Sequence, residues 1–414
     1  MISVTKPRRD LHYIVTGRNS INPSPIPLPL SDCSPILTIP TLQIFEPTMN
    51  SKSPILRLTL ALLLATPALS SAAPGKAEPV AGAIKPRVVT EPTKHDTDDP
   101  AIWINPANPA ASLVLGTDKN TDGALYVWGL DGKIHHDKVV RGLVRPNNVD
   151  IAYGVMLGGE KIDIAVVTER YANRLRVYRL PDMAPVDGGG IPVFEGEAAR
   201  DCMGVALYTR ASDGAVFAIV SRSDYRAPLQ GYLHQYRLVD DGNGVLRGVF
   251  SRSFGTWSGR KEIEAIAVDN ELGYVYFADE NHGIRKYHAD PAADDSDEQI
   301  AEFGLDGFTE DREGISIYRT GAGTGYIVVS NQQDNSFNVY AREGSAADPH
   351  AHTLLKRIDV STIESDGSDV THAELPGFPG GLFVAMSNGQ VFHYYAWVDL
   401  IAGSDLKQAG PDAK

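Results

Sequence analysis

Acidic residues occur in pairs at the start of several strand-like apolar segments of this chain. The pairs are Asp98 with Asp99, Glu262 with Glu264, and Asp311 with Glu313. Carboxylates that share one surface cannot all stay ionised without partners, and a hard divalent cation removes that conflict. Ca²⁺ takes about six to eight oxygen ligands from Asp, Glu, Asn and backbone carbonyls. The pattern therefore predicts calcium, whereas the scattered His95, His282 and His372 argue against zinc.

Basic residues end other apolar segments, and they change the ligand that we expect beside the calcium ions. The clearest examples are Lys119, Arg170 and Arg222. Arg clamps some phosphate oxygens bidentately while a metal ion neutralises others. The sequence has neither a Gly-rich phosphate loop nor a G-x-S-x-G nucleophile motif. We therefore expect a metal-activated water to attack a phosphate ester, with a nearby acid protonating the leaving alkoxide.

An internal repeat predicts the fold that positions these residues. Six segments of alternating apolar residues each carry an aromatic residue near the end, at intervals of 50, 58, 51, 53 and 52 residues. The aromatic residues are Trp128, Tyr178, Tyr236, Tyr287, Tyr340 and Phe392. An apolar strand precedes each segment, and a further strand precedes that one. The period predicts an all-β fold, a single six-bladed β-propeller with four antiparallel strands per blade.

The strand order predicts where the acids and bases lie. Because consecutive strands of a blade are antiparallel, the start of the innermost strand and the end of the second strand share one face of the disk. We therefore expect a ring around the central channel made of Asp98, Asp99, Asn148, Asp150, Glu262, Glu264, Asp311 and Glu313, surrounded by Lys119, Arg170, Arg222, Asp279 and Glu280. Ionisable residues that cluster in this way are typical of functional sites.

The N-terminal region has the pattern of a leader. Residues 49–72 combine a basic start, an apolar run and small residues suited to cleavage, which predicts a signal peptide. A cytoplasmic tail before a signal anchor is the open alternative for residues 1–50. The predicted parts are an upstream extension, disordered or from a misassigned start (1–48), the signal peptide (49–72), a linker (73–86), the propeller (87–403) and a tail (404–414). We expect a secreted or periplasmic protein with no membrane span after cleavage.

The charge balance excludes a general nucleic-acid binder. Residues 1–72 hold six of the 38 Lys and Arg and three of the 52 Asp and Glu, so the remainder carries 32 basic and 49 acidic residues, a formal charge of −17. Binding to a phosphate backbone depends on excess basic residues. Cys202 is the one cysteine after the leader, and we expect a buried small side chain rather than a catalytic thiol. We expect a monomer.

From about Glu91 to Trp397 the chain resembles the β-propeller phytases, the calcium-dependent alkaline phytases. The most specific shared segments are Asp98-Asp99-Pro-Ala-Ile-Trp103, Asn147-Asn148-Val-Asp150, Gly159-Glu160-Lys161-Ile-Asp163-Ile-Ala165, Asp279-Glu280, Asp311-Arg-Glu313-Gly-Ile and Ser365-Asp-Gly-Ser-Asp369. The resemblance implies a 3-phytase, a phosphoric monoester hydrolase. Several calcium ions and basic residues would form a cleavage site and an adjacent affinity site for inositol polyphosphate.

The resemblance also implies roles for individual residues. The calcium ligands would be Asp98, Asp99, Asn148, Glu264, Glu280, Asp311 and Glu313, and acidic positions of the family's last blade match Asp366 and Asp369. Lys119 and Arg170 would hold phosphate. The predicted catalytic set is Lys119, Arg170, Glu264, Glu280, Asp311 and Glu313, and the predicted metal set also includes Asp150 and Asp279.

Three departures from the family pattern concern the second phosphate pocket. The second of two adjacent family lysines is Asn120, a common tyrosine is Met203, and the lysine-containing turn of the third blade becomes Ser221-Arg222-Ser-Asp224 with an insertion through Gln230. Arg222 and Arg226 are the candidates to replace the missing charge. The predicted substrate-binding set is therefore Lys119, Asn120, Arg170, Arg222 and Arg226.

Two other functions are compatible with a propeller, since a fold does not fix a function. A propeller lactonase or sugar hydrolase would hold one central metal and would need neither Lys119 nor Arg170. A non-catalytic propeller that binds protein or glycan would have few acids on its central face. The positioned acids and bases favour calcium-dependent hydrolysis of phytate.

Overall fold

The structure is a computed structural model that describes residues 78–410 and 413. The predicted upstream extension and signal peptide lie outside the described residues. Within the described part, strands dominate, and the helical elements are one short helix, α1 (Trp397–Leu400), and three 3₁₀ turns. None of these helices has the length and hydropathy that crossing a membrane requires.

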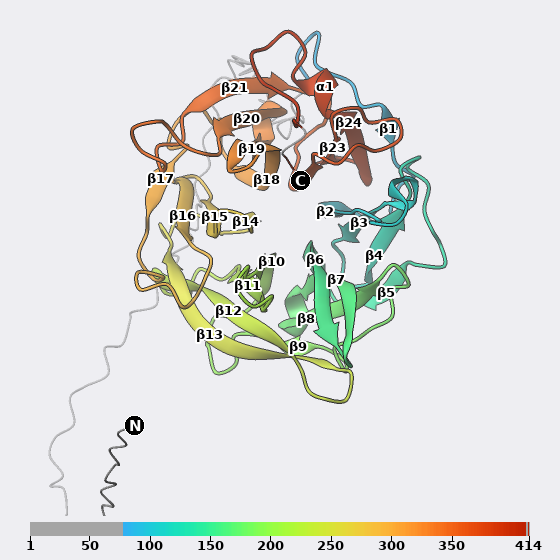
Figure 1. Cartoon of the computed structure of the whole chain (residues 1–414), viewed down its shortest axis with the longest axis vertical. Helices are drawn as coiled ribbons and strands as arrows, with labels where there is room; N and C mark the ends of the chain where they lie inside the picture. Colours follow the sequence, from blue (N-terminus) through green and yellow to red (C-terminus); the bar gives the residue numbers. More distant parts are fainter. Residues whose placement is uncertain (1–77, 411–412, 414) are drawn as a thin grey trace, which may run out of the picture. The chain divides into compact units, whose positions relative to one another are not determined.

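The strands form six four-stranded antiparallel sheets arranged as blades around a centre (Figure 1), which confirms the predicted six-bladed propeller. From the innermost strand outward, the first three blades are β2 (Thr97–Trp103), β3 (Leu113–Asp118), β4 (Gly123–Trp128) and β5 (Val140–Leu143); β6 (Pro146–Leu157), β7 (Glu160–Glu169), β8 (Arg174–Leu180) and β9 (Ile191–Pro192); and β10 (Cys202–Thr209), β11 (Val216–Arg222), β12 (Gln230–Asp240) and β13 (Leu246–Thr256). The last three are β14 (Ile266–Asp269), β15 (Tyr274–Asp279), β16 (Gly283–His288) and β17 (Ala301–Phe303); β18 (Arg312–Gly321), β19 (Thr324–Asn331), β20 (Ser336–Ala341) and β21 (Leu354–Asp359); and β22 (Ser368–Thr371), β23 (Leu382–Ser387), β24 (Val391–Ala396) and β1 (Val88–Val89).

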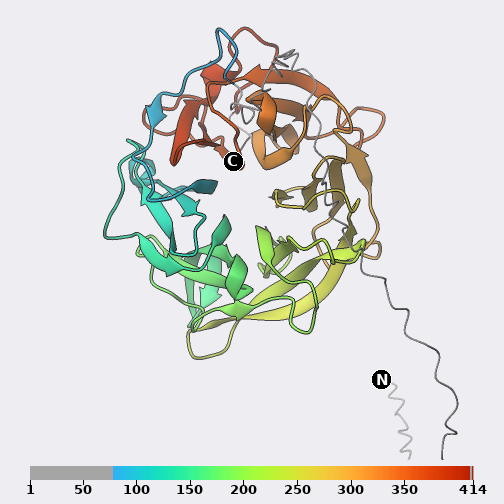
Figure 2. The same ribbon diagram turned by 180° about the vertical axis from the view of Figure 1, so that it is seen from behind.

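The N-terminal strand closes the ring by completing the last blade. β1 pairs antiparallel with β24, with Val88 opposite Tyr394 and Val89 opposite His393. Figure 2 shows this junction from behind, with the blue strand beside the red blade. The two ends of the propeller sequence are thereby held in one sheet, which fixes the first blade against the sixth.

Apolar side chains fill the seams between adjacent blades. All six aromatic residues of the repeat are buried: Trp128, Tyr178, Tyr236, Tyr287, Tyr340 and Phe392. The ring of Trp128 meets that of Phe392 edge-on, with centroids 5.3 Å apart, across the seam between the first and last blades. Cys202 is also fully buried, and burial raises the pKa of its thiol to about 12. The expectation of a small buried side chain at Cys202 is confirmed.

The strand register confirms that inner-strand starts and second-strand ends share one face. Thr97 at the start of β2 lies opposite Asp118 at the end of β3, and Arg312 at the start of β18 lies opposite Asn331 at the end of β19. The residues just before or within each inner strand therefore lie beside those that follow the second strand. This arrangement positions the acids and bases described next.

Candidate active site

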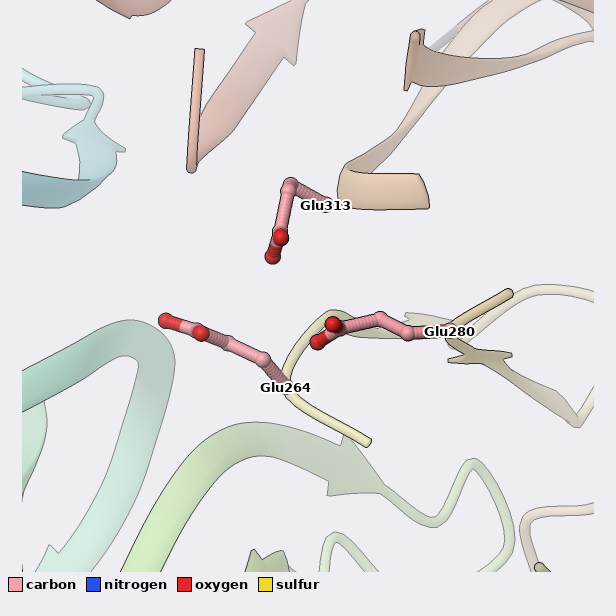
Figure 3. Close-up of side chains that lie close together, drawn as sticks. All are labelled: Glu264, Glu280 and Glu313. Atoms are coloured by element: carbon pink, nitrogen blue, oxygen red, sulfur yellow. The ribbon is translucent and has the colours of Figure 1, made fainter. Parts of the chain in front are cut away.

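Three glutamates point toward one another on the predicted face (Figure 3). Glu264 precedes β14, Glu280 follows β15, and Glu313 lies near the start of β18. Each offers a carboxylate oxygen that lies within 4.8 Å of the other two, and all three residues are buried. We call these three residues the glutamate cluster. It brings together three members of the predicted catalytic and metal sets.

Close contact between inner strands holds Glu264 in place. Gly204 lies in β10, and a Cβ atom at this position would collide with the backbone oxygen of Glu264. Only glycine lets the two backbones approach so closely. On the next seam, the Thr168 hydroxyl donates to the backbone oxygen of Met203 at 2.5 Å. The Gly204 contact and the Thr168 hydrogen bond thus connect neighbouring blades.

Several carboxylate oxygens of the site lack a hydrogen-bond partner among the described residues. They are Oε2 of Glu313, Oδ2 of Asp98 and both oxygens of Glu280, where Lys261 Nζ lies 3.0 Å from Oε2 as an ion pair without hydrogen-bond geometry. A buried polar atom normally has a partner, and a buried charge without one is costly. Oxygens of this kind, grouped on several strands, are suited to a cation.

Burial raises the pKa of every member of the glutamate cluster. The pKa of Glu280 rises to about 8, because burial outweighs the opposing effect of Lys261. Burial also raises the pKa of Glu264 and of Glu313 well above the usual value, and neighbouring carboxylates add to the shift. The cluster therefore favours either protons or a bound cation at neutral pH.

Lys119 lies against two acids of the site. Its Nζ is 3.2 Å from Oδ1 of Asp98 and also donates to Asp366. Burial lowers the pKa of Lys119, but Asp98, Asp366 and Glu264 outweigh burial and raise it well above the usual value. Burial raises the pKa of Asp98 to about 6, against the effect of Lys119. The predicted grouping of Lys119 with metal-set acids thus matches the geometry.

A second lysine, which sequence reasoning missed, contacts the opposite side of the site. Lys261 Nζ lies 2.7 Å from Asp311, 3.0 Å from Glu280 and 3.9 Å from Glu313. The available signal was its position just before the acidic start of the fourth blade, at Glu262 and Glu264. The Lys261 side chain is 38% exposed, so it covers the acids from the solvent side.

Three acids of the predicted metal set lie in the central channel and join neighbouring blades. Oδ2 of Asp99, Asp150 and Asp369 accepts, respectively, the backbone N–H of Val149 at 3.1 Å, of Leu207 at 2.6 Å and of Ile102 at 2.8 Å. These acids line a cavity of about 160 Å³ to which no member of the glutamate cluster contributes. Burial raises the pKa of Asp150 to about 7 and that of Asp369 to about 6. The structure gives these acids a bridging role between blades.

Two other predicted residues already have buried partners. Asp279 accepts from Arg285 at 2.8 Å and from the Ser258 hydroxyl at 2.7 Å. Arg222 is fully buried, stacks on Phe194, and donates to three carbonyl oxygens, those of Ala199, Gly231 and Tyr232. Contrary to expectation, both oxygens of Asp279 already accept hydrogen bonds from Ser258 and Arg285, and the Arg222 guanidinium donates to backbone oxygens.

Asparagines contribute beside the glutamate cluster. Asn147, which lies in a shared segment but had no predicted role, donates from Nδ2 to Glu264 at 2.7 Å and to Oδ1 of Asn148 at 3.2 Å. Its own Oδ1 is buried without a hydrogen-bond partner among the described residues. Asn120 instead caps a turn, since its Oδ1 accepts the backbone N–H of Asp122 at 3.2 Å. The predicted ligand Asn148 is thus next to the cluster, whereas Asn120 has a local structural role.

Arginine side chains line or contact the wall of a cavity that Lys261 also lines. Arg170 donates to the Ser223 hydroxyl at 2.6 Å, and its Nε has no hydrogen-bond partner among the described residues. Arg226 and Arg260 line a cavity of about 620 Å³ together with Lys261. Arg226 is exposed and pairs with Asp224 at 2.5 Å. Asp201, Asp224 and Glu262 line the same cavity, so three bases and three acids face it.

Comparison with known proteins identifies the family. A family model described as Phytase matches residues 52–394. The chain belongs to the phytase family. A 3-phytase of Bacillus subtilis (strain 168) is 33% identical over 307 residues, which cover 71% of this chain and 76% of that protein. The matched region of the phytase family contains the glutamate cluster, both lysines and the channel acids. The protein is a phosphoric monoester hydrolase.

Proposed function

We propose that this phytase-family enzyme is a calcium-dependent hydrolase that removes phosphate from phytate, myo-inositol hexakisphosphate. The observation that carries the proposal is the glutamate cluster, in which oxygens of Glu280 and Glu313 have no hydrogen-bond partner among the described residues and two lysine side chains lie beside the site acids. The Bacillus subtilis relative bears the name 3-phytase. A cation-binding centre next to phosphate-binding bases fits that activity.

The donor set fits calcium. Residues that would hold the ions are Glu264, Glu280, Glu313, Asp98, Asp311, Asn148 and Asp366. All offer oxygen atoms, the ligands that Ca²⁺ prefers, and they come from several blades as a site for more than one ion requires. Bound calcium would neutralise carboxylate and phosphate charge and lower the pKa of a bound water.

The basic residues would bind and orient the substrate. Lys119 lies against the site acids Asp98 and Asp366, and Arg170, which donates to Ser223, retains a donor without a partner in the described chain. Arg226 and Arg260 line the adjacent cavity. Two neighbouring groups of bases favour an ester that carries several phosphates, because a second phosphate can be held while the first reacts.

Phosphate release from phytate tests the proposal. We expect release with calcium present, loss of release with excess chelator, and recovery when calcium is restored. A substrate with one phosphate, such as glycerol 2-phosphate, should be cleaved more slowly at equal concentration. Release that chelation leaves unchanged would overturn the calcium dependence, and no release from phytate under any calcium condition would overturn the activity.

We also propose that the enzyme is secreted or periplasmic, on the basis of the signal-peptide pattern in residues 49–72. The propeller then acts as a monomer outside the cytoplasm. N-terminal sequencing of the exported protein should find a start near Ala73. An exported chain that still begins upstream of residue 49, or a protein that stays in the cytoplasm, would contradict this.

A further inference from the structure

Lys261 is placed where a cation bound to the site would meet the solvent. Its Nζ lies 2.7 Å from Asp311, 3.0 Å from Glu280 and 3.9 Å from Glu313. These are three of the residues that would hold calcium. We infer that Lys261 is a built-in counter-ion that competes with calcium for these carboxylates and so sets the calcium concentration at which the site fills. The inference rests on the proposed calcium site.

The competition follows from charge and space. Lys261 already holds the Asp311 and Glu280 carboxylates at ion-pair distance. A divalent ion bound to the same oxygens would lie within a few ångströms of the ammonium, where like charges repel strongly even at an intermediate dielectric. Calcium binding therefore requires the Lys261 side chain to leave.

The neighbouring cavity gives the displaced side chain a destination. Lys261 lines the cavity of about 620 Å³ that Arg226 and Arg260 also line, and the acids Asp201, Asp224 and Glu262 face the same space. Its side chain is 38% exposed, whereas that of Lys119 is 17% exposed and held between Asp98 and Asp366. A phosphate group in this cavity would attract the displaced ammonium. Lys261 would then exchange a carboxylate partner for a phosphate partner when calcium binds.

The backbone of Lys261 is anchored separately from its side chain. The indole N–H of Trp257 donates to the backbone oxygen of Lys261, and Trp257 itself is buried. A substitution that shortens or discharges the side chain therefore leaves the loop in place. This separation makes Lys261 a residue whose charge can be tested without dismantling the site.

Calcium titration of the full chain by isothermal calorimetry provides the test, with Lys261→Met, Lys261→Arg and the exposed control Lys133→Met. We expect Lys261→Met to bind calcium about tenfold or more tightly than the wild type, because no ammonium has to be displaced. Lys261→Arg and Lys133→Met should stay near the wild-type affinity. In the steady state with saturating calcium, Lys261→Met should raise KM for phytate more than it lowers kcat.

Thermal unfolding separates this role from a merely structural one. Without calcium, Lys261→Met should melt below the wild type, since buried carboxylates lose their counter-ion. With saturating calcium, the difference in melting temperature between Lys261→Met and the wild type should disappear or reverse. A lysine with only a structural role would lower the melting temperature in both conditions.

The outcomes distinguish this inference from the proposed function. Equal calcium affinity in wild type and Lys261→Met would overturn the role of Lys261, while calcium-stimulated phosphate release would leave the proposed function standing. Absence of calcium binding in both proteins would overturn the role as well, and the phytate assay with chelator would then judge the proposed function by itself.

Discussion

The inner strand β14 has buried acids near both ends, and the two ends are built differently. At one end, Asp269 receives two hydrogen bonds of 2.6 Å from Arg342, which also donates to Glu271 at 2.8 Å. Arg342 and Asp269 are both buried. At the other end, Glu264 belongs to the glutamate cluster, where several oxygens have no hydrogen-bond partner in the described chain.

The difference shows that burial alone does not mark a functional acid. Asp269 has exchanged water for a complete set of partners, so its charge is compensated within the fold. The glutamate cluster has lost water and has gained only Lys261 and Asn147 as partners for three carboxylates, so the rest of its compensation must come from a cation or from protons. The compensated ion pair of Asp269 and Arg342 holds neighbouring blades together, whereas the glutamate cluster is available for a ligand.

The largest expected effect comes from removing Arg342 from its buried ion pair with Asp269. Arg342→Met should destabilise the protein by about 3–5 kcal/mol, because Asp269 would remain buried with its charge uncompensated. Urea unfolding measures the loss, and activity per folded molecule should change little. Arg179→Met, which removes an exposed partner of Asp182, serves as the control and should unfold like the wild type.

Adding Asp269→Asn to Arg342→Met sharpens the comparison. The double variant should recover part of the lost stability, since the unpaired carboxylate is the main cost. No recovery in the double variant would mean that packing of the Arg342 side chain, and not its charge, stabilises this end of β14.

The second effect comes from removing one charge from the glutamate cluster. Glu280→Gln should reduce phosphate release at least about hundredfold, because an electrostatic centre loses a ligand charge. Its stability without calcium should stay within about 1 kcal/mol of wild type, since Gln keeps the size of the side chain and burial, which raises the pKa of Glu280 to about 8, makes the charged form costly in the fold. The stabilisation that calcium gives should shrink. Glu298→Gln, in an exposed loop, is the control, and equal activity in both variants would refute the assignment.

The sequence predicted the parts of this comparison that depend on periodicity. The repeated aromatic residues predicted six blades, because each marks the third strand of a four-stranded unit. Antiparallel strand order then predicted the common face of Asp98, Glu264, Glu280 and Glu313. These inferences hold because they need only the strand order and not the conformation of any loop.

The sequence did not predict the parts that depend on loops and on partners from distant segments. Lys261 reaches the acids through the conformation of the β13–β14 connection, which no repeat specifies. Arg222 resembled an available base, yet Phe194 and three backbone carbonyls enclose it. Asp279 resembled a ligand until its ion pair with Arg285 was located. Residue type and strand position alone could not distinguish acids that have partners within the fold from acids that are available to a ligand.

The third effect concerns His352, a buried histidine whose contribution to stability depends on pH. His352 is buried, and its Nε2 lies 3.1 Å from Lys286 Nζ while its Nδ1 lies 2.7 Å from the backbone oxygen of Ala341. Burial lowers the pKa of His352 to about 4, below the value of about 6.5 in an unfolded chain. Its contribution to stability is therefore present above pH 6.5 and is lost as the pH falls toward 4.

Urea unfolding between pH 7 and pH 5 measures that loss. His352 should account for about 1–2 kcal/mol of the decrease, and His352→Gln should make the pH dependence shallower by a similar amount. His136→Gln, at an exposed position, should leave the slope unchanged. A slope that does not differ between His352→Gln and wild type would show that His352 titrates with its unfolded pKa.

The smallest expected effect concerns Arg226, an exposed residue that lines the cavity next to Lys261. Arg226 pairs with Asp224 at the surface, where solvent screens the interaction, so Arg226→Gln should leave the melting temperature unchanged. Because Arg226 lines the cavity beside the glutamate cluster, the same substitution should raise KM for phytate about threefold with little change in kcat. Arg237→Gln, an exposed arginine of β12, is the matched control. A fall in kcat at constant KM would place Arg226 in the chemical step instead, and unchanged kinetics would limit the substrate-binding bases to those that touch the glutamate cluster.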